Sequence, residues 1–186
     1  MQSRKLGSLH AHIAGGPDRE GGGEGPVIVL LHGFGAPGDD LVSLHRVFRV
    51  ETEVRWVFPE APLDLSAVGY GLGARAWWML DLAALERTMQ TGPEDRSGEH
   101  PAELPEARGA LSELLDVVEK ELRPSKLILG GFSQGAMLSL DAALHDPRPL
   151  AGLIQLSGTV IAESEWKPRM ASRQGLPVFQ SQRRAA

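Results

Sequence analysis

The sequence predicts an α/β protein with a mostly parallel central sheet flanked by helices, and two observations support this prediction. Short runs rich in β-branched residues alternate with stretches of helical periodicity, which is the order expected of β-α-β units. These runs are almost continuously apolar, which is typical of strands buried on both faces. At 186 residues with 42% hydrophobic content, the chain suits a single domain over residues 1–186.

Five short runs are the candidate strands. They are residues 27–31 (VIVLL), 54–58 (VRWVF), 127–132 (LILGGF), 150–156 (LAGLIQL) and 176–180 (LPVFQ). A leucine-rich stripe at helical spacing in residues 103–122 predicts an amphipathic helix against the sheet. A second helix pattern follows residue 133, and a third is expected from about Asp39.

Two glycine-containing regions interrupt this alternation. Residues 14–26 predict an exposed turn or short loop. Residues 63–100 contain glycines, prolines, two tryptophans and a charged stretch. We expect this second region to form an excursion above the sheet.

Composition argues against several classes of function. A net charge of −5, without a Lys/Arg cluster on one helix face, argues against nucleic-acid binding. The absence of cysteine excludes disulfides, thiolate metal sites and cysteine nucleophiles. The longest apolar run, residues 27–31, is far shorter than the roughly 20 residues that span a bilayer. Because the N-terminal stretch also lacks the apolar core of a signal peptide, we expect a cytoplasmic protein.

A glycine-flanked serine follows the third predicted strand. Gly131 and Gly135 stand two residues before and two after Ser133. A nucleophile elbow requires this pattern, because its sharp turn from strand to helix leaves no room for a Cβ at either position. A chain with 22 glycines can produce the pattern by chance, and a helix-capping serine is the alternative. The strand before the motif and the helix pattern after it favour a nucleophile.

A second glycine-rich turn, LLHGFGAPGDD (30–40), follows the first predicted strand. Such a loop offers backbone N–H groups, and an amide that stabilises an oxyanion is worth about 10²–10³ in rate. Hydrolases pair such an amide with that of the residue after the nucleophile, so the donors here would be Phe34 and Gln134. A plain βα turn and a phosphate-binding loop are the alternatives, but the phosphate-binding motif requires a lysine that is absent here.

Four stretches, in the same order, give the chain a resemblance to the bacterial carboxylesterase and acyl-protein thioesterase branch of the α/β-hydrolases. LLHGFGA resembles the oxyanion loop, RWVFPEAP the strand and turn that follow, ARAWWMLD the arginine-aromatic substrate loop, and LGGFSQGAM the elbow. The resemblance covers roughly residues 7–181 and implies the α/β-hydrolase fold. It also implies hydrolysis of a small carboxylic ester or thioester through an acyl-serine intermediate, without a metal or other cofactor.

The resemblance assigns a role to each candidate residue. Ser133 would be the nucleophile, and the amides of Phe34 and Gln134 would form the oxyanion hole. Substrate binding would fall to residues in the excursion at about 63–100, namely Arg75, Trp77 and Trp78, and support of the site to His32, Gly33, Gly131 and Gly135. Packing against the core is the alternative role for at least one of the two tryptophans.

The sequence departs from the resemblance after the serine. In this fold an acid and then a histidine follow the nucleophile, but the last histidine in the chain is His145. His145 ends the predicted helix, about 18 Å from Ser133. We therefore expect a C-terminally truncated hydrolase fold that lacks the family's acid, last strand and histidine loop. His32 is the alternative base, and the later acids, Asp141, Asp146, Glu163 and Glu165, are expected to be solvated charges.

Three functions follow from these motifs. The first is a carboxylesterase whose turnover is severely reduced when this chain acts alone. The second is a catalytically impaired fragment whose base and acid come from another chain or a swapped segment. In that case the last strand would lie at an exposed sheet edge that permits a homo-oligomer. The third is a non-catalytic, hydrolase-like binding module, and an incomplete or frame-altered sequence is a further interpretation.

Overall fold

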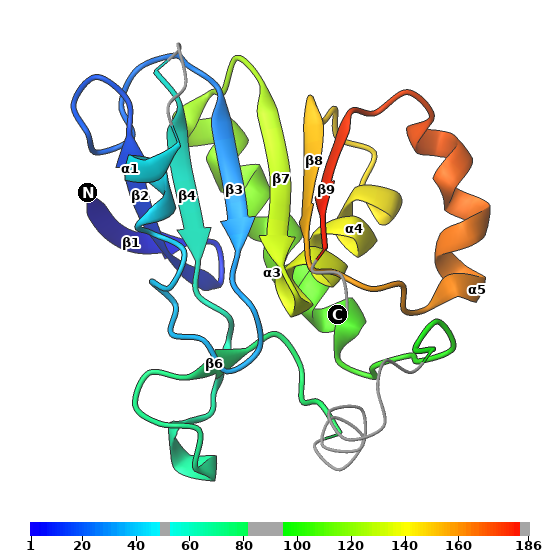
Figure 1. Ribbon diagram of the computed structural model, residues 1–186. Coiled ribbons are helices and arrows are strands. Elements are labelled where there is room, and N and C mark those ends of the chain that lie inside the picture. The colour runs from blue at the N-terminus through cyan, green and yellow to red at the C-terminus, as the bar shows by residue number, and fades with distance from the viewer. Residues whose placement is uncertain (49–52, 82–94, 183–186) are drawn as a thin grey trace.

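The centre of the computed structural model, which describes residues 1–48, 53–81 and 95–182, is a seven-stranded sheet (Figure 1). The strand order is β1-β2-β4-β3-β7-β8-β9. β4, β3, β7, β8 and β9 are parallel to one another, whereas β1 and β2 are antiparallel to their neighbours. The prediction of a mostly parallel α/β sheet is confirmed. The strands are β1 (Gln2–Leu6), β2 (Leu9–Gly15), β3 (Val27–Leu31), β4 (Arg55–Pro59), β7 (Leu127–Phe132), β8 (Gly152–Leu156) and β9 (Val178–Ser181).

The five predicted strands correspond to the five parallel ones, and β3 and β7 have the predicted bounds. The β1–β2 hairpin was not predicted. Its signal is present in β2, where Leu9, Ala11 and Ile13 alternate with more exposed residues and are at most 3% exposed. β2 pairs along β4, so the hairpin extends the sheet at its N-terminal edge.

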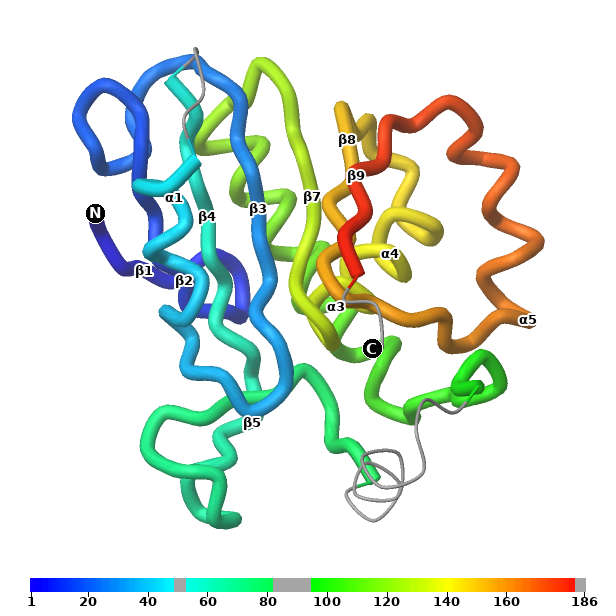
Figure 2. Tube along the Cα trace, in the orientation of Figure 1, coloured from blue at the N-terminus to red at the C-terminus, as the bar shows by residue number. Residues whose placement is uncertain are grey.

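Two long helices cover one face of the sheet. α3 (Leu104–Val117), continued by a wider helical turn, η2 (Val118–Leu122), and α4 (Gln134–His145) lie on the same side (Figure 1; Figure 2). The leucine-rich stripe of α3 is buried and shares one core cluster with inward-facing residues of β2, β3 and β7. The predicted amphipathic helix against the sheet is therefore confirmed.

The opposite face carries a smaller apolar cluster, formed by Ile28, Leu30, Trp56 and Phe58. The glycine-rich turn of residues 30–40, named the oxyanion turn after the role that the resemblance implies, is followed by a short helix, α1 (Leu44–Val47). The helix expected from about Asp39 therefore begins later, at Leu44. Five of the amides between residues 40 and 46 bond three residues back, so this stretch forms successive turns before and through α1.

The chain between β4 and α3 leaves the main sheet. β5 (Leu63–Asp64) and β6 (Arg75–Ala76) form a separate two-stranded sheet, with η1 (Ser66–Val68) between them. This small sheet lies beyond the carboxyl ends of β3 and β4 (Figure 1). Residues 82–94 of the predicted excursion lie outside the described residues.

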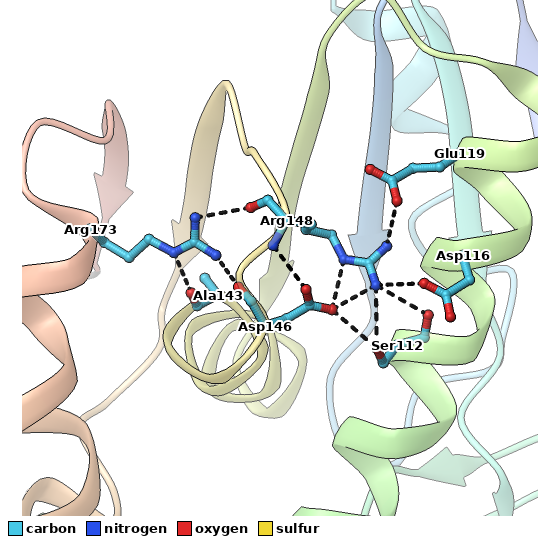
Figure 3. A network of polar contacts seen from close by, with 7 residues as sticks. All are labelled: Ser112, Asp116, Glu119, Ala143, Asp146, Arg148 and Arg173. Atoms are coloured by element: carbon cyan, nitrogen blue, oxygen red, sulfur yellow. Dashed lines mark hydrogen bonds and ion pairs between the residues drawn. The ribbon is translucent and has the colours of Figure 1, made fainter.

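The segment between β8 and β9 forms α5 (Glu163–Trp166) and η3 (Lys167–Arg173). Arg173 holds this segment on the end of α4 by donating to the carbonyls of Ala143, Asp146 and Arg148 (Figure 3). Arg148 in turn bonds to Asp146 and to Ser112 of α3. One network of polar contacts therefore joins α3, α4 and η3.

No helix within the described residues is long and apolar enough to cross a membrane.

Candidate active site

The turn between β7 and α4 has the geometry of a nucleophile elbow. Ser133 lies there with φ 53° and ψ −115°, a strained conformation for a residue with a Cβ. A Cβ at Gly131 would lie 2.3 Å from the carbonyl carbon of Gly135, and one at Gly135 would lie 2.3 Å from Leu31 O. Both glycines are therefore sterically required. Ser133 is half-buried, and its backbone N–H donates to Leu156 O at 2.8 Å.

The oxyanion turn passes directly beside this elbow. A Cβ built on Gly33 would lie 3.4 Å from the Cβ of Ser133. The amide after that of Phe34 is bonded, because the Gly35 N–H donates to Arg75 O at 2.9 Å. Neither the Phe34 N–H nor the Gln134 N–H has a hydrogen-bond partner among the described residues. The turn and the elbow thus bring two free amides to the same end of the sheet.

His32 supports the oxyanion turn through both of its ring nitrogens. The Ala61 N–H, which can only donate, bonds to Nε2 at 3.0 Å, so Nδ1 carries the ring proton and donates it to Gly33 O at 2.8 Å. Burial is the largest cause that lowers the pKa of His32, whose side chain is 1% exposed. A neutral imidazole with both nitrogens engaged has no site left for the serine proton. This geometry favours the supporting role over the role of base.

The side chain of Gln134 connects the elbow to the tryptophan loop. It is 1% exposed, its Oε1 accepts the Trp77 N–H at 2.9 Å, and its Nε2 donates to Trp78 O at 2.8 Å. The Trp77 indole N–H donates to His32 O at 2.9 Å. Sequence reasoning assigned a role only to the backbone amide of Gln134. The partners of its side chain lie 57 and 56 residues away, and no local pattern points to them.

Both tryptophans of this loop are 1% exposed. Their burial favours the packing role that the sequence left open, and a substrate contact of Trp77 or Trp78 stays a prediction. Arg75, in β6, donates to Ala61 O at 3.0 Å and pairs with Glu60 at 3.3 Å. These contacts join β6 to the segment after β4, and the substrate role of Arg75 also stays a prediction.

Four of the other histidines of the described chain have side-chain contacts elsewhere. His145 ends α4, where Nδ1 bonds to Asp141 O at 2.8 Å, and His100 contacts Ser164 at 3.3 Å. His12 pairs with Glu60 at 3.1 Å, and His45 bonds to Val42 O. None of the bonds found among the described residues joins a histidine to Ser133.

The expectation that Asp141 is a solvated charge is wrong. Its side chain is 0% exposed and accepts from Arg108 at 2.9 Å and from the indole N–H of Trp166 at 2.8 Å. Asp141 faces inward because it lies on the buried side of α4, among Leu138, Ala142 and Leu144. A buried carboxylate is stable there because both of its oxygens are hydrogen-bonded.

The strand order, the elbow and the adjoining oxyanion turn define an α/β-hydrolase fold. The model of the Phospholipase/Carboxylesterase family matches residues 19–183. The chain belongs to this family, which confirms the resemblance seen in the four motifs.

Curated relatives include the acyl-protein thioesterase 1 of Schizosaccharomyces pombe, 32% identical over 148 residues, which cover 78% of this chain and 61% of that protein. The acyl-protein thioesterase 1 of Emericella nidulans is 29% identical over 134 residues, which cover 70% of this chain and 55% of that protein. The chain therefore spans less than two thirds of the length of these relatives.

Two solved structures resemble the chain closely in fold. The crystal structure of esterase PE8 has a TM-score of 0.70 at 27% identity, covering 92% of this chain and 73% of that one. That of Zea mays acyl-protein thioesterase 2 has a TM-score of 0.66 at 20% identity, covering 92% and 74%. The second likeness bears on the fold alone.

Proposed function

We propose that this chain carries the nucleophile and oxyanion hole of an ester hydrolase that acts on small carboxylic esters or thioesters. Ser133 Oγ attacks the acyl carbonyl, and the amides of Phe34 and Gln134 stabilise the oxyanion of the tetrahedral intermediate. The serine proton passes through solvent water to the departing alcohol or thiol, which leaves an acyl-serine. A second water hydrolyses the acyl-serine to the carboxylic acid and free Ser133. Gly33, Gly131 and Gly135 allow the close approach that this arrangement needs.

The observation that carries this proposal is the pairing of a strained serine with two unpartnered amides. Ser133 is held at φ 53°, and the N–H groups of Phe34 and Gln134, which have no hydrogen-bond partner among the described residues, come from the adjacent turn and from the residue after the serine. A helix-capping serine would not explain this geometry, because the Ser133 side chain makes no capping hydrogen bond to α4. Membership of the family and the thioesterase relatives support the same reaction class.

The test is hydrolysis of a short-chain p-nitrophenyl ester and of the matching thioester by the wild-type chain and by Ser133→Ala. We expect slow turnover, because a triad without its base retains roughly 10³–10⁴ over water from the oxyanion hole and binding, and we expect a fluorophosphonate to label the wild type at Ser133 but not Ser133→Ala. The proposal is rejected if the two proteins have equal rates and a fluorophosphonate does not label Ser133. That result would support a non-catalytic binding module instead. A rate typical of intact hydrolases would mean that this chain holds a base among its own residues.

A second candidate is a site completed by another polypeptide or by a second copy of this chain. It is favoured by His32, whose ring nitrogens both bond to backbone groups. β9 has all four residues exposed and lies at the edge of the sheet, so it could pair with a further strand. Light scattering checks this candidate: turnover that rises with oligomer formation supports it, and equal turnover by monomer and oligomer contradicts it.

A further inference from the structure

The side-chain amide of Gln134 uses both of its ends on one loop. Oε1 accepts the Trp77 N–H and Nε2 donates to Trp78 O, at 2.9 and 2.8 Å. The amide is buried, so water cannot replace either bond. The residue directly after the nucleophile therefore holds the backbone of the tryptophan loop.

Trp77 extends this connection to the oxyanion turn. Its indole N–H donates to His32 O at 2.9 Å, and the centroids of the Trp77 and His32 rings are 5.6 Å apart. His32 donates to Gly33 O, which belongs to the same peptide group as the Phe34 N–H. In a trans peptide the C=O and N–H point in opposite directions, so a bond that holds Gly33 O also sets the direction of the Phe34 N–H.

We infer that Gln134 is a positioning residue whose side chain, acting through Trp77, holds the turn of His32–Phe34 against the elbow. The amides of Phe34 and Gln134 then converge on one point beside Ser133. This inference rests on the proposed function, in which these two amides bind the oxyanion. It gives Gln134 two tasks, since its backbone donates to the oxyanion while its side chain aims the second donor.

Gln134→Glu separates these tasks because it preserves size and one acceptor but removes the Nε2 donor. A carboxylate oxygen would then face Trp78 O, and burial would raise the pKa of the new carboxyl group. Protonation restores a donor to Trp78 O, so lowering the pH should repair the variant. The titratable groups nearby are His32, whose Nε2 accepts the Ala61 N–H and whose pKa is lowered by burial, and the Arg75–Glu60 ion pair. Any pH effect of these groups is also present in the wild type, which is measured at the same pH values.

The experiment measures two quantities in the wild type and in Gln134→Glu across a series of pH values. One is the rate at which a fluorophosphonate labels Ser133, and the other is hydrogen exchange of the Trp77 indole N–H, followed by NMR. At alkaline pH, where the new carboxyl group is ionised, we expect labelling of the variant to be slower by about 10- to 100-fold, as for a displaced donor. The indole N–H should exchange faster. Both differences should shrink as the pH is lowered.

Two further variants make the result specific. Gln134→Met lacks both polar atoms, so its defect should persist at every pH. Gln155→Glu is a control for the same change at a glutamine outside the tryptophan loop, because Gln155 is 9% exposed and donates to Ser139 Oγ at 2.8 Å. The Ser139 hydroxyl donates to Ala136 O at 2.9 Å in the wild type and can turn to donate to a carboxylate instead. Gln155→Glu should label at the wild-type rate.

Labelling of Gln134→Glu at the wild-type rate, or slowed equally at every pH, would overturn the inference. Failure of the wild type to label at all would instead reject the proposed function, and Trp77 exchange would still decide the inference. Exchange unchanged in Gln134→Glu would then overturn the holding role, and faster, acid-repaired exchange would support it.

Discussion

The indole N–H of Trp166 donates to Asp141 Oδ1 across 2.8 Å, and both side chains are 0% exposed. Trp166 belongs to α5 and Asp141 to α4, so the bond fastens the segment between β8 and β9 to the helix that starts at the nucleophile. Arg108 of α3 donates to the other carboxylate oxygen. One buried carboxylate therefore joins three elements behind the sheet.

Asp141→Ala should destabilise the protein through the partners it leaves behind. The buried indole N–H of Trp166 alone is expected to cost about 1–3 kcal/mol once unpaired. Urea unfolding measures the change, and Asp116→Ala is the control. Asp116 is 71% exposed, and Arg148 keeps Glu119 and Asp146 as partners without it, so its loss should cost at most about 1 kcal/mol. Equal losses in the two variants would contradict the structural role of Asp141.

Gly131→Ala and Gly109→Ala should have opposite effects on stability. The new methyl at Gly131 would lie 2.3 Å from backbone of the elbow, so the variant should unfold more easily and label slowly at Ser133. Gly109 lies inside α3 with nothing within 4 Å of its added Cβ, so alanine there should stabilise by about 0.5–1 kcal/mol. Thermal unfolding distinguishes the two, and a stabilising Gly131→Ala would contradict the close approach at the elbow.

Asp146 should make stability depend on acid pH. Burial raises the pKa of Asp146, but hydrogen bonds from Arg148 and Ser112 outweigh this effect and leave the pKa below its ordinary value. The contribution of ionised Asp146 to the free energy of unfolding is therefore complete above the pKa that Asp146 has in the unfolded chain, about 3.9. This contribution is lost as the pH falls through the lower pKa of Asp146 in the folded protein. The gap in free energy of unfolding between wild type and Asp146→Asn should narrow below about pH 4. A gap that stays constant with pH would refute this linkage.

Substitutions of His32 should separate a supporting residue from a base. Asn places a donor near the position of Nδ1 and can keep the bond to Gly33 O, so His32→Asn should label at Ser133 within about tenfold of the wild type. His32→Leu leaves the Ala61 N–H unpaired and leaves Gly33 O with only the Ala36 N–H, at 3.4 Å, so it should label more slowly than His32→Asn. Equal and near-complete loss of labelling in both variants would mean that His32 takes the serine proton.

Two of the strands that the sequence predicted share one physical property. β3 and β4 are buried over their whole length, and such apolar runs are visible without tertiary information. The β1–β2 hairpin was missed because its outer strand, QSRKL, is mostly polar and mostly exposed. This strand belongs to the sheet through its backbone pairing with β2, which no side-chain pattern reveals. A strand buried on both faces appears in the sequence as a continuous apolar run, whereas a strand buried on one face appears only as an alternation of apolar and polar residues, which is harder to recognise.

Local pattern also marked the elbow and the oxyanion turn, because steric demands confine Gly131 and Gly135 to glycine. The roles of the Gln134 and Asp141 side chains depend on residues far along the chain, including Trp78 and Arg108, 56 and 33 residues away. A polar residue on a helical pattern is ordinarily solvent-facing, and only the packed structure reveals the partners that permit burial.

All four tryptophans of the chain are at most 4% exposed, and they lie in three separate places. Trp56 stacks between Phe48 and Phe58 on the sheet face opposite α3 and α4, whereas Trp77 and Trp78 border the elbow. Trp166 lies behind α4. The protein thus carries intrinsic optical reporters of three regions, and single replacements by phenylalanine would assign each part of its emission. Local unfolding around the site could then be followed by tryptophan fluorescence, separately from unfolding of the rest of the molecule.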